Sequence, residues 1–239
     1  MTPGSSDNPA RASDPSSFYD ENAQDFFDRT VNLDLTASHE RFLAFVPTGG
    51  SILDVGCGSG RDSSAFLAAG YQVVAIDASQ RLCDLASAHL GQPVLHRDVM
   101  TLDLGRTFDG AWACASFVHM DELQLSKALR RVAAHLEIGG VLFMSIKHAP
   151  GRSYTGEREA DPTALEQGER RFELYDRKRF RPVLNQLEGL RLVHQWSNRG
   201  GVCSDHLWFN VILKKNSKEA SGKSVSGKRR DPGCRRDGY

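Results

Sequence analysis

The residues with the clearest chemical potential lie in one short segment, ILDVGCGSG, at positions 52–60. Its glycines allow a tight turn from a strand into a helix and a close approach of the backbone to a ligand; they are Gly56, Gly58 and Gly60. Asp54 lies just before them and suits a cationic group better than a pyrophosphate. Arg61 stands where the GxGxxG dinucleotide motif needs its last glycine, so the segment does not match that fingerprint.

Two further acids follow at positions where strands are expected to end. Asp77 ends the second strand, a position from which a carboxylate can accept both hydroxyls of a ribose. Asp98 follows the third strand and could accept the exocyclic amine of adenine, with Val99 packing on the ring. Taken alone, Asp98 is equally well explained as the cap of a turn or helix. S-adenosylmethionine carries an ammonium, a ribose and an adenine, so it suits all of these positions.

The stretch ILDVGCGSGRDSSAFLAAGYQVVAIDAS, residues 52–79, resembles the first two motifs of class I S-adenosylmethionine-dependent methyltransferases. Within that superfamily it is most similar to the small-molecule branch, which includes the tellurite-resistance and ubiquinone-biosynthesis types. The segments FDGAWACASFVHM, GGVLFMSIK and WFNVILKK add weaker support, and the resemblance covers about residues 18–215.

The resemblance implies that S-adenosylmethionine is the cofactor and that a small molecule accepts its methyl group. It places the methionine part of the cofactor against Asp54 and the three glycines, the ribose on Asp77, and the adenine between Asp98 and Val99. Arg61 opens a helix, where the helix dipole disfavours a cation; either the cofactor carboxylate or the neighbouring Asp62 could offset this. The expected cofactor-binding residues are Asp54, Gly56, Gly58, Gly60, Arg61, Asp77, Ala78, Asp98, Val99 and Cys114.

The acceptor is expected beyond the carboxyl ends of strands four and five, where open α/β sheets bind ligands. Methyl transfer from a sulfonium is an in-line displacement, so the protein mainly positions the nucleophile and excludes water. His119 is the candidate catalytic base, because imidazole titrates near neutral pH; the alternative is a histidine bonded to a nearby carbonyl. No metal site is expected. The candidate acceptor-binding residues are Tyr19, Ser116, His119, Lys147 and Arg171.

Two segments outside the repeating core could cover the acceptor. A helix expected over residues 18–29 carries Phe26 and Phe27, which either form a lid over the sulfonium or are ordinary core aromatics. The polar segment 148–171 is too long for an ordinary connection. Its arginines could clamp an anionic acceptor or lie on a solvated loop; they are Arg152, Arg158, Arg170 and Arg171.

A regular alternation of strands and helices must position these residues. Strands are expected at 51–55, 71–76, 93–96, 108–114, 141–147, 190–197 and 206–214, and helices at 18–29, 38–46, 61–69, 80–90, 122–136 and 176–187. The predicted fold is a Rossmann-like, doubly wound α/β sheet of seven strands with the N-terminal helices as a partial lid. The sheet is mostly parallel, and its last strand is antiparallel because it forms a hairpin with the sixth.

Composition divides the chain into a folded part and two tails. Residues 1–16 and 216–239 are poor in apolar groups and are predicted to be disordered, leaving a methyltransferase domain at 17–215 with 148–171 as a loop or lid insertion. The formal net charge is zero, but the segment from 214 onward holds nine Lys and Arg against three Asp and Glu. The rest is therefore mildly acidic, which argues against a basic groove for nucleic acid.

The cellular setting expected from the sequence is cytoplasmic. The first residues lack the apolar core of a signal peptide, and no apolar run approaches the ~20 residues that span a bilayer. The five cysteines are scattered, odd in number and form no CxxC pair, which suits a reducing compartment. The sequence assigns no oligomeric state.

Three other functions compete with small-molecule methylation. A nucleic-acid (RNA) methyltransferase could use the basic tail, but base-methylating enzymes place prolines after strand four, where this chain reads CASF. A non-catalytic regulatory protein could bind S-adenosylmethionine through the same motif. A nicotinamide oxidoreductase is disfavoured by Asp54 and Arg61.

Overall fold

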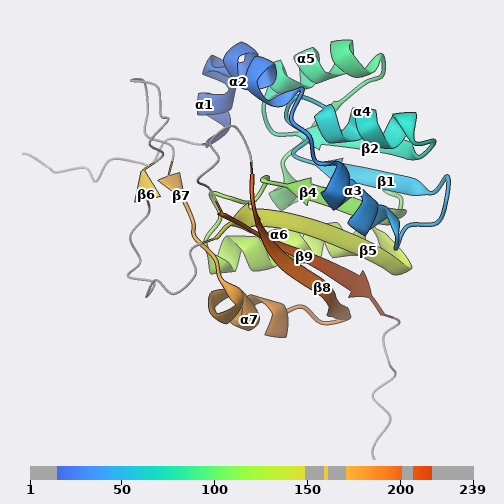
Figure 1. Cartoon of the computed structure of the whole chain (residues 1–239), viewed down its shortest axis with the longest axis vertical. Coiled ribbons are helices and arrows are strands. Elements are labelled where there is room, and N and C mark those ends of the chain that lie inside the picture. Colours follow the sequence, from blue (N-terminus) through green and yellow to red (C-terminus); the bar gives the residue numbers. More distant parts are fainter. Residues whose placement is uncertain (1–14, 149–158, 161–170, 201–206, 217–239) are drawn as a thin grey trace, which may run out of the picture.

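One seven-stranded mixed sheet forms the centre of the protein, in the order β3-β2-β1-β4-β5-β9-β8 (Figure 1). The computed structural model describes residues 15–148, 159–160, 171–200 and 207–216. Strands β1 to β5 pair in parallel, whereas β9 is antiparallel to both of its neighbours. This confirms the predicted Rossmann-like sheet. The strands are β1 (Ser51–Val55), β2 (Gln72–Asp77), β3 (Leu95–His96), β4 (Phe108–Cys114), β5 (Leu136–Lys147), β8 (Leu190–Arg199) and β9 (Leu207–Lys215).

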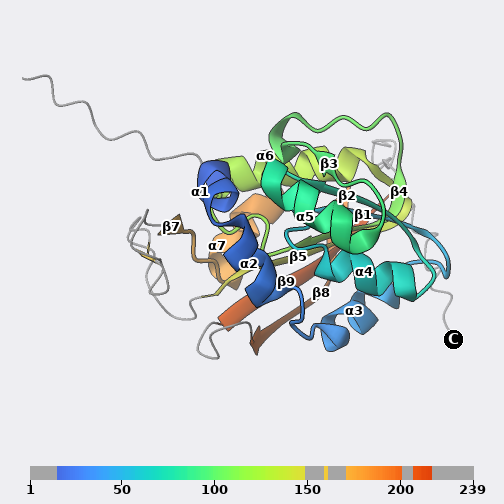
Figure 2. The ribbon, with the colours of Figure 1, turned by 90° about the horizontal axis from the view of Figure 1, so that it is seen from above.

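Helices cover both faces of this sheet (Figures 1 and 2). Side chains of α3 and α4 pack on one face and those of α6 and α7 on the other. No helix in the described parts of the chain is both long enough and apolar enough to cross a membrane. The helices are α1 (Pro15–Glu21), α2 (Ala23–Thr30), α3 (Thr36–Leu43), α4 (Arg61–Ala68), α5 (Gln80–Leu90), α6 (Glu122–Ala134) and α7 (Arg177–Asn185), with a short 3-10 helix at Val99–Thr101.

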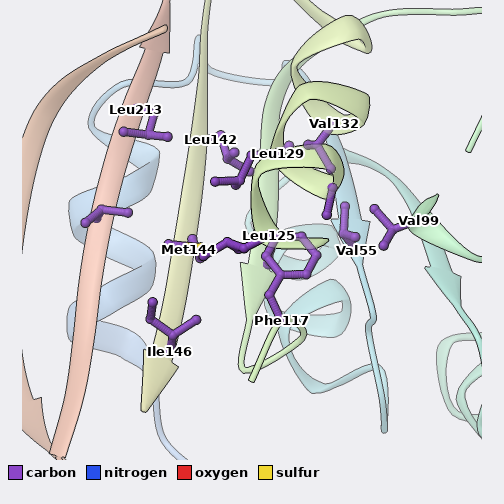
Figure 3. Packing of buried hydrophobic residues seen from close by; sticks show 14 of the residues in the cluster. Val55, Val99, Phe117, Leu125, Leu129, Val132, Leu142, Met144, Ile146 and Leu213 are labelled. Carbon is purple, nitrogen blue, oxygen red and sulfur yellow. The ribbon is translucent and has the colours of Figure 1, made fainter. Parts of the chain in front are cut away.

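The larger core lies between α6 and the sheet. In Figure 3, Leu125, Leu129 and Val132 of α6 lie against apolar side chains of the strands, among them Leu142 and Met144 of β5. The three α6 residues are spaced three or four apart in the sequence, so they form one stripe along the helix. The packing fixes α6 behind β4 and β5, the two strands beyond which an acceptor is expected.

Local signals set several element ends where the sequence predicts them. Strands β1 and β4 and helix α5 have the expected bounds. Asp121 caps α6 and makes a reciprocal capping box with Gln124. Gly91 ends α5 with a φ of 66°, a conformation that glycine adopts without strain.

The expected start of the fifth strand at residue 141 is wrong. Strand β5 begins at Leu136, which pairs with Phe108 of β4. Gly139, with a φ of 88°, and Gly140 lie inside the strand, and the register of the β4–β5 pair shifts there. The two glycines therefore make an irregularity in the strand and not a turn before it.

The single N-terminal helix expected at residues 18–29 is two helices. Helix α1 begins at Pro15, and the chain leaves helical geometry at Asn22 before α2 starts. The Asn22 side chain donates to the carbonyl of Phe18 at 2.9 Å. An asparagine that bonds its own backbone in this way competes with helix continuation.

Most of the predicted tails and insertion lies outside the described residues. Pro15 and Ser16, expected in the disordered N-terminal tail, belong to α1, where a proline suits the first turn. Of the 148–171 insertion, the structure describes His148 and a small antiparallel pair, β6 (Glu159–Ala160) and β7 (Arg171–Phe172). The basic segment from 217 onward is outside the description.

Helix α3 docks on the sheet at a point where β4 has no side chain. A Cβ atom added at Gly110 would lie 2.7 Å from Cζ of Phe42 and 2.9 Å from Cγ2 of Val46. The Phe42 ring is fully buried, 5.2 Å from the ring of Trp112 between centroids. The close approach of α3 thus requires glycine at this position.

Gly110→Ala should lower the free energy of unfolding by about 1–3 kcal/mol, the usual cost of overpacking a core. Urea unfolding followed by circular dichroism measures this. Adding Phe42→Leu removes the clashing ring atom, so the double variant should lose less than the sum of the two single variants. Strictly additive losses would show that Phe42 does not press on this position.

Candidate functional site

A cavity of about 940 Å³ lies at the carboxyl edge of the parallel strands. It is bounded by the glycine turn after β1, the residues that follow β2, β3 and β4, and the N-terminal helices. Most of the residues predicted for cofactor or acceptor binding line it together: Tyr19, Gly56, Gly58, Arg61, Asp77, Ala78, Asp98, Val99, Cys114, Ser116, His119 and Lys147. Asp54 and Gly60 are not among the lining residues, and the side chain of Arg171 lies outside the described part.

The glycine turn is held tightly from both sides. Gly56 and Gly58 have φ values of 66° and 57°, which favour glycine. A Cβ at Gly56 would lie 2.6 Å from the Ser116 hydroxyl, and one at Gly58 would lie 3.0 Å from the Phe26 ring. Ser116 itself donates to the carbonyl of Val55, so it braces the turn from the β4 side.

Asp77 is preorganised by backbone amides beside the cavity. One carboxylate oxygen accepts from the Gly58 amide and the other from the Ser79 amide, each at 2.9 Å. Burial raises the pKa of Asp77, although the two amides favour the charged form. Each oxygen keeps a further lone pair, so the carboxylate can still accept two hydroxyl hydrogens.

Asp98 and Val99 form the part of the cavity beyond β3. Asp98 accepts from the amide of Met100 at 2.8 Å and so caps the 3-10 helix that begins at Val99. The Asp98 side chain is exposed and lines the cavity, while Val99 is buried below it. The capping role expected as an alternative is therefore real, and it leaves the second carboxylate oxygen available.

Asp54 and Gly60 lie behind the turn. Asp54 is buried and accepts a hydrogen bond of 2.6 Å from the Ser63 hydroxyl of α4. Burial, followed by the negative charge of Asp62, raises the pKa of Asp54 to about 8. Gly60 packs against α5, because a Cβ there would lie 3.2 Å from the Leu90 side chain.

Arg61 forms an ion pair with the next residue in the chain, Asp62. The guanidinium donates two hydrogen bonds to the Asp62 carboxylate, at 2.9 and 2.8 Å. His39 and the Trp112 indole contact the same carboxylate, at 2.9 and 2.8 Å. Burial opposes ionisation of Asp62, but the His39 and Arg61 contacts outweigh it and hold its pKa well below the usual range. Of the two partners considered for Arg61, the structure shows Asp62.

Cys114 is a neutral lining residue. Its sulfur lies 3.7 Å from the Arg61 guanidinium, but burial raises the pKa of the thiol to about 12. A thiol with that pKa stays protonated at neutral pH, so it is a poor nucleophile.

Helices α1 and α2 lie beside α5 (Figure 2), and residues of both line the cavity. Asp20 of α1 accepts from the Ser79 hydroxyl and, at 3.2 Å, from the Arg81 amide. These contacts tie α1 to the first turn of α5, two residues from Asp77. Phe26 packs edge-on against Tyr19, with ring centroids 5.3 Å apart. Phe27 faces the His89 ring instead, so the two phenylalanines have different surroundings.

Four predicted or neighbouring groups meet at the end of the cavity where the acceptor is expected, called the acceptor end below. The Tyr19 hydroxyl lies 3.1 Å from Nε2 of His119. The His119 ring stacks on Phe172, with centroids 4.8 Å apart. Lys147 places Nζ 3.5 Å from the centre of the same Phe172 ring, and the lysine is buried. His119, the candidate base, is thus oriented by side chains from two distant segments.

Sequence reasoning did not predict four lining residues of the cavity, which lie on β5, β8 and β9. Ser145, Asn198, Trp208 and Asn210 also line it. Ser145 precedes Lys147 by two residues in the same strand, so alternation along β5 was a signal that it faces the same side. The asparagines had no such signal, because their position depends on how the C-terminal hairpin pairs with β5.

Comparison with known proteins gives matches over the sheet and its turns. Residues 52–140 match a family described as "Methyltransferase domain". The cypemycin N-terminal methyltransferase of Streptomyces sp is 32% identical over 55% of this chain and 57% of its own length. The O-methyltransferase cnsE of Penicillium expansum is 38% identical over 41% of this chain and 38% of its own. The chain therefore spans between about two fifths and three fifths of these relatives.

Solved structures share the fold at low sequence identity. The 1,6-didemethyltoxoflavin-N1-methyltransferase of Burkholderia thailandensis superposes with a TM-score of 0.66 at 19% identity, covering 84% of this chain and 87% of that one. That protein was solved with 1,6-didemethyltoxoflavin and S-adenosylhomocysteine bound. The agreement shows that the sheet and its flanking helices are shared.

Asp54→Asn should remove a pH-dependent loss of stability. Because burial raises this pKa, protonated Asp54 contributes to the stability of the fold. The contribution is complete below the ordinary pKa of 3.8 and is lost as the pH rises through about 8. We therefore expect the melting temperature of the variant, relative to the parent, to increase between pH 5 and pH 8 without cofactor. Asp84→Asn, at an exposed position of α5, is the control. Parallel pH profiles for parent and Asp54→Asn would contradict the raised pKa.

Proposed function

We propose that this chain is a class I S-adenosylmethionine-dependent methyltransferase that transfers a methyl group to a small-molecule acceptor, as its match to a methyltransferase domain and its fold support. The observation that carries the proposal is the order of groups along the cavity. The glycine turn follows β1, Asp77 ends β2, and Asp98 and Val99 follow β3; these three strands are neighbours in the sheet, and all of these groups line the cavity. A methionine, a ribose and an adenine require this spatial order.

The residues present fit this cofactor. The turn is a cradle that a Cβ at Gly56 or Gly58 would fill. Asp77 offers a charged acceptor for the ribose hydroxyls, and Val99 offers an apolar surface for the adenine. Asp54 accepts a hydrogen bond from Ser63 behind the turn. Burial favours its protonated form, and an ammonium bound nearby would favour the ionised form instead. S-adenosylmethionine supplies an activated methyl group on a sulfonium.

The chain's own task is then to orient the acceptor and exclude water. Tyr19 and Phe26 close the cavity from the N-terminal helices, and Phe172 closes it from β7. His119, held between Tyr19 and Phe172, can take a proton from an acceptor or direct a hydrogen bond to it. Lys147 adds a positive charge to the same end.

A small molecule as acceptor agrees with the relatives. The similar protein of Burkholderia thailandensis holds 1,6-didemethyltoxoflavin beside S-adenosylhomocysteine, and a sugar N-methyltransferase of Streptoalloteichus sp shares the fold with a TM-score of 0.57. A cavity of about 940 Å³ lies within the usual size range for small-molecule sites.

Calorimetry with S-adenosylhomocysteine and with NAD tests the cofactor. We expect S-adenosylhomocysteine to bind and NAD to bind far more weakly or not at all. Asp77→Ala should weaken S-adenosylhomocysteine binding about tenfold to a hundredfold, because hydrogen bonds to a charged group are worth ~1.5–3 kcal/mol. Asp84→Ala on the exposed side of α5 should leave the affinity unchanged. Tighter binding of NAD, or full affinity in a folded Asp77→Ala variant, would contradict the proposal.

His119→Ala tests the acceptor end. With an acceptor found by screening small amines, phenols and acids, turnover should fall at least about a hundredfold, the lower end of general-base catalysis. Affinity for S-adenosylhomocysteine should hold, because His119 lies at the acceptor end. Tyr19→Phe keeps the ring and removes only the hydroxyl, so it should cause a smaller loss. Turnover within a few-fold of the parent would make His119 a structural residue.

A further inference from the structure

A row of side chains crosses four neighbouring strands on the face of the sheet that carries α3 and α4. Cys114 of β4 pairs in register with Ser145 of β5, Ser145 pairs with Asn210 of β9, and Asn210 pairs with Trp196 of β8. Residues directly opposite one another in adjacent strands point to the same face. The row therefore starts at Cys114, beside Arg61, and leads away from the cofactor end of the cavity.

Two members of this row are polar, deeply buried and line the cavity. Ser145 is 4% exposed and Asn210 is 2% exposed. Among the described residues, the structure shows no hydrogen bond to the Ser145 hydroxyl and none to Oδ1 of Asn210. A buried polar atom without a hydrogen-bond partner lowers the stability of a protein by about 1–3 kcal/mol. A ligand that forms hydrogen bonds with these two atoms would remove this cost.

The orientation of the Asn210 amide follows from its surroundings. Its nitrogen donates to Oδ1 of Asn198 at 2.6 Å and lies 3.4 Å from the carbonyls of Trp196 and Trp208. All three neighbours are acceptors, so the nitrogen belongs on that side. The Asn210 oxygen consequently faces the opposite side, toward Ser145 and β5, and can only accept a hydrogen bond.

The surroundings of these two atoms are aromatic. Trp208 precedes Asn210 by two residues on the same side of β9 and lines the cavity. Its indole nitrogen already donates to the Gly200 carbonyl at 3.0 Å. Phe143 and Phe172 line the cavity as well. With adjacent strands ~4.8 Å apart, Asn210 lies roughly 10 Å from Cys114 across the sheet, about the length of a fused two-ring compound.

Resting on the proposed function, we infer that Ser145 and Asn210 form a specificity subsite for a planar acceptor that carries an N–H or O–H group. The donor group of the acceptor bonds Oδ1 of Asn210, and Ser145 supplies the second contact. The aromatic rings hold the plane of the acceptor, whose far end extends toward Cys114 and the methyl donor. An acceptor without the donor leaves Oδ1 of Asn210 unpaired and is rejected.

Matched pairs of probes test this subsite without a known substrate. The probes are benzimidazole with 1-methylbenzimidazole and 2-naphthol with 2-methoxynaphthalene. Each is titrated by ligand-observed NMR into the full chain saturated with S-adenosylhomocysteine. We expect each parent compound to bind at least about fivefold more tightly than its methylated twin, the effect of one unpaired buried acceptor. In Asn210→Leu this ratio should fall to about one.

Two further variants separate binding from folding. Ser145→Ala removes one hydroxyl with little change in volume and should lower the ratio in part. Asn216→Leu replaces an exposed asparagine just beyond β9 and should leave the ratio as in the parent. Equal binding of both twins to the parent protein, or no binding of either pair, would overturn the subsite. Failure of S-adenosylhomocysteine to bind in the first place would instead overturn the proposed function.

Discussion

The geometry of the site depends most on the hydrogen bonds that the Asp62 carboxylate accepts. It is buried at the start of α4 and joins three elements, through His39 of α3, Arg61 of α4 and Trp112 of β4. A buried charge is tolerated only when it is paired and hydrogen-bonded, so the network holds all three elements in one arrangement. Trp112 in turn stacks on Phe143 of β5 at 3.8 Å between centroids.

The Asp62 network lies between two groups of cavity residues at the edge of the sheet. On one side, the glycine turn and Asp77 are shaped by backbone contacts, and α1 is tied to the same region through Asp20 and Ser79. On the other side, the row that begins at Cys114 carries polar groups across β5 and β9. Under the proposed function, the cofactor would bind at the turns of the parallel half of the sheet and the acceptor against the antiparallel half.

The parts that the sequence predicts well are those determined by neighbouring residues. The cap at Asp121, the end of α5 at Gly91 and the glycine turn each depend on a few adjacent positions. Contacts between distant segments could not be predicted in the same way. Trp112 meets Asp62 across 50 residues, and Asn210 reaches the cavity only because β9 inserts between β5 and β8. The break between α1 and α2 at Asn22 accompanies a hydrogen bond from the Asn22 side chain to the backbone. The pattern of apolar residues in the sequence does not reveal such a bond.

The central claim is that the carboxyl edge of this sheet holds S-adenosylmethionine with its sulfonium turned toward the acceptor end. A crystal structure of the complex with S-adenosylhomocysteine tests it most directly. The account predicts both ribose hydroxyls within hydrogen-bond distance of Asp77, the adenine against Val99, and the sulfur on the side of Cys114 and His119. Electron density for the ligand elsewhere, or an Asp77 carboxylate that contacts only the Gly58 and Ser79 amides, would contradict it.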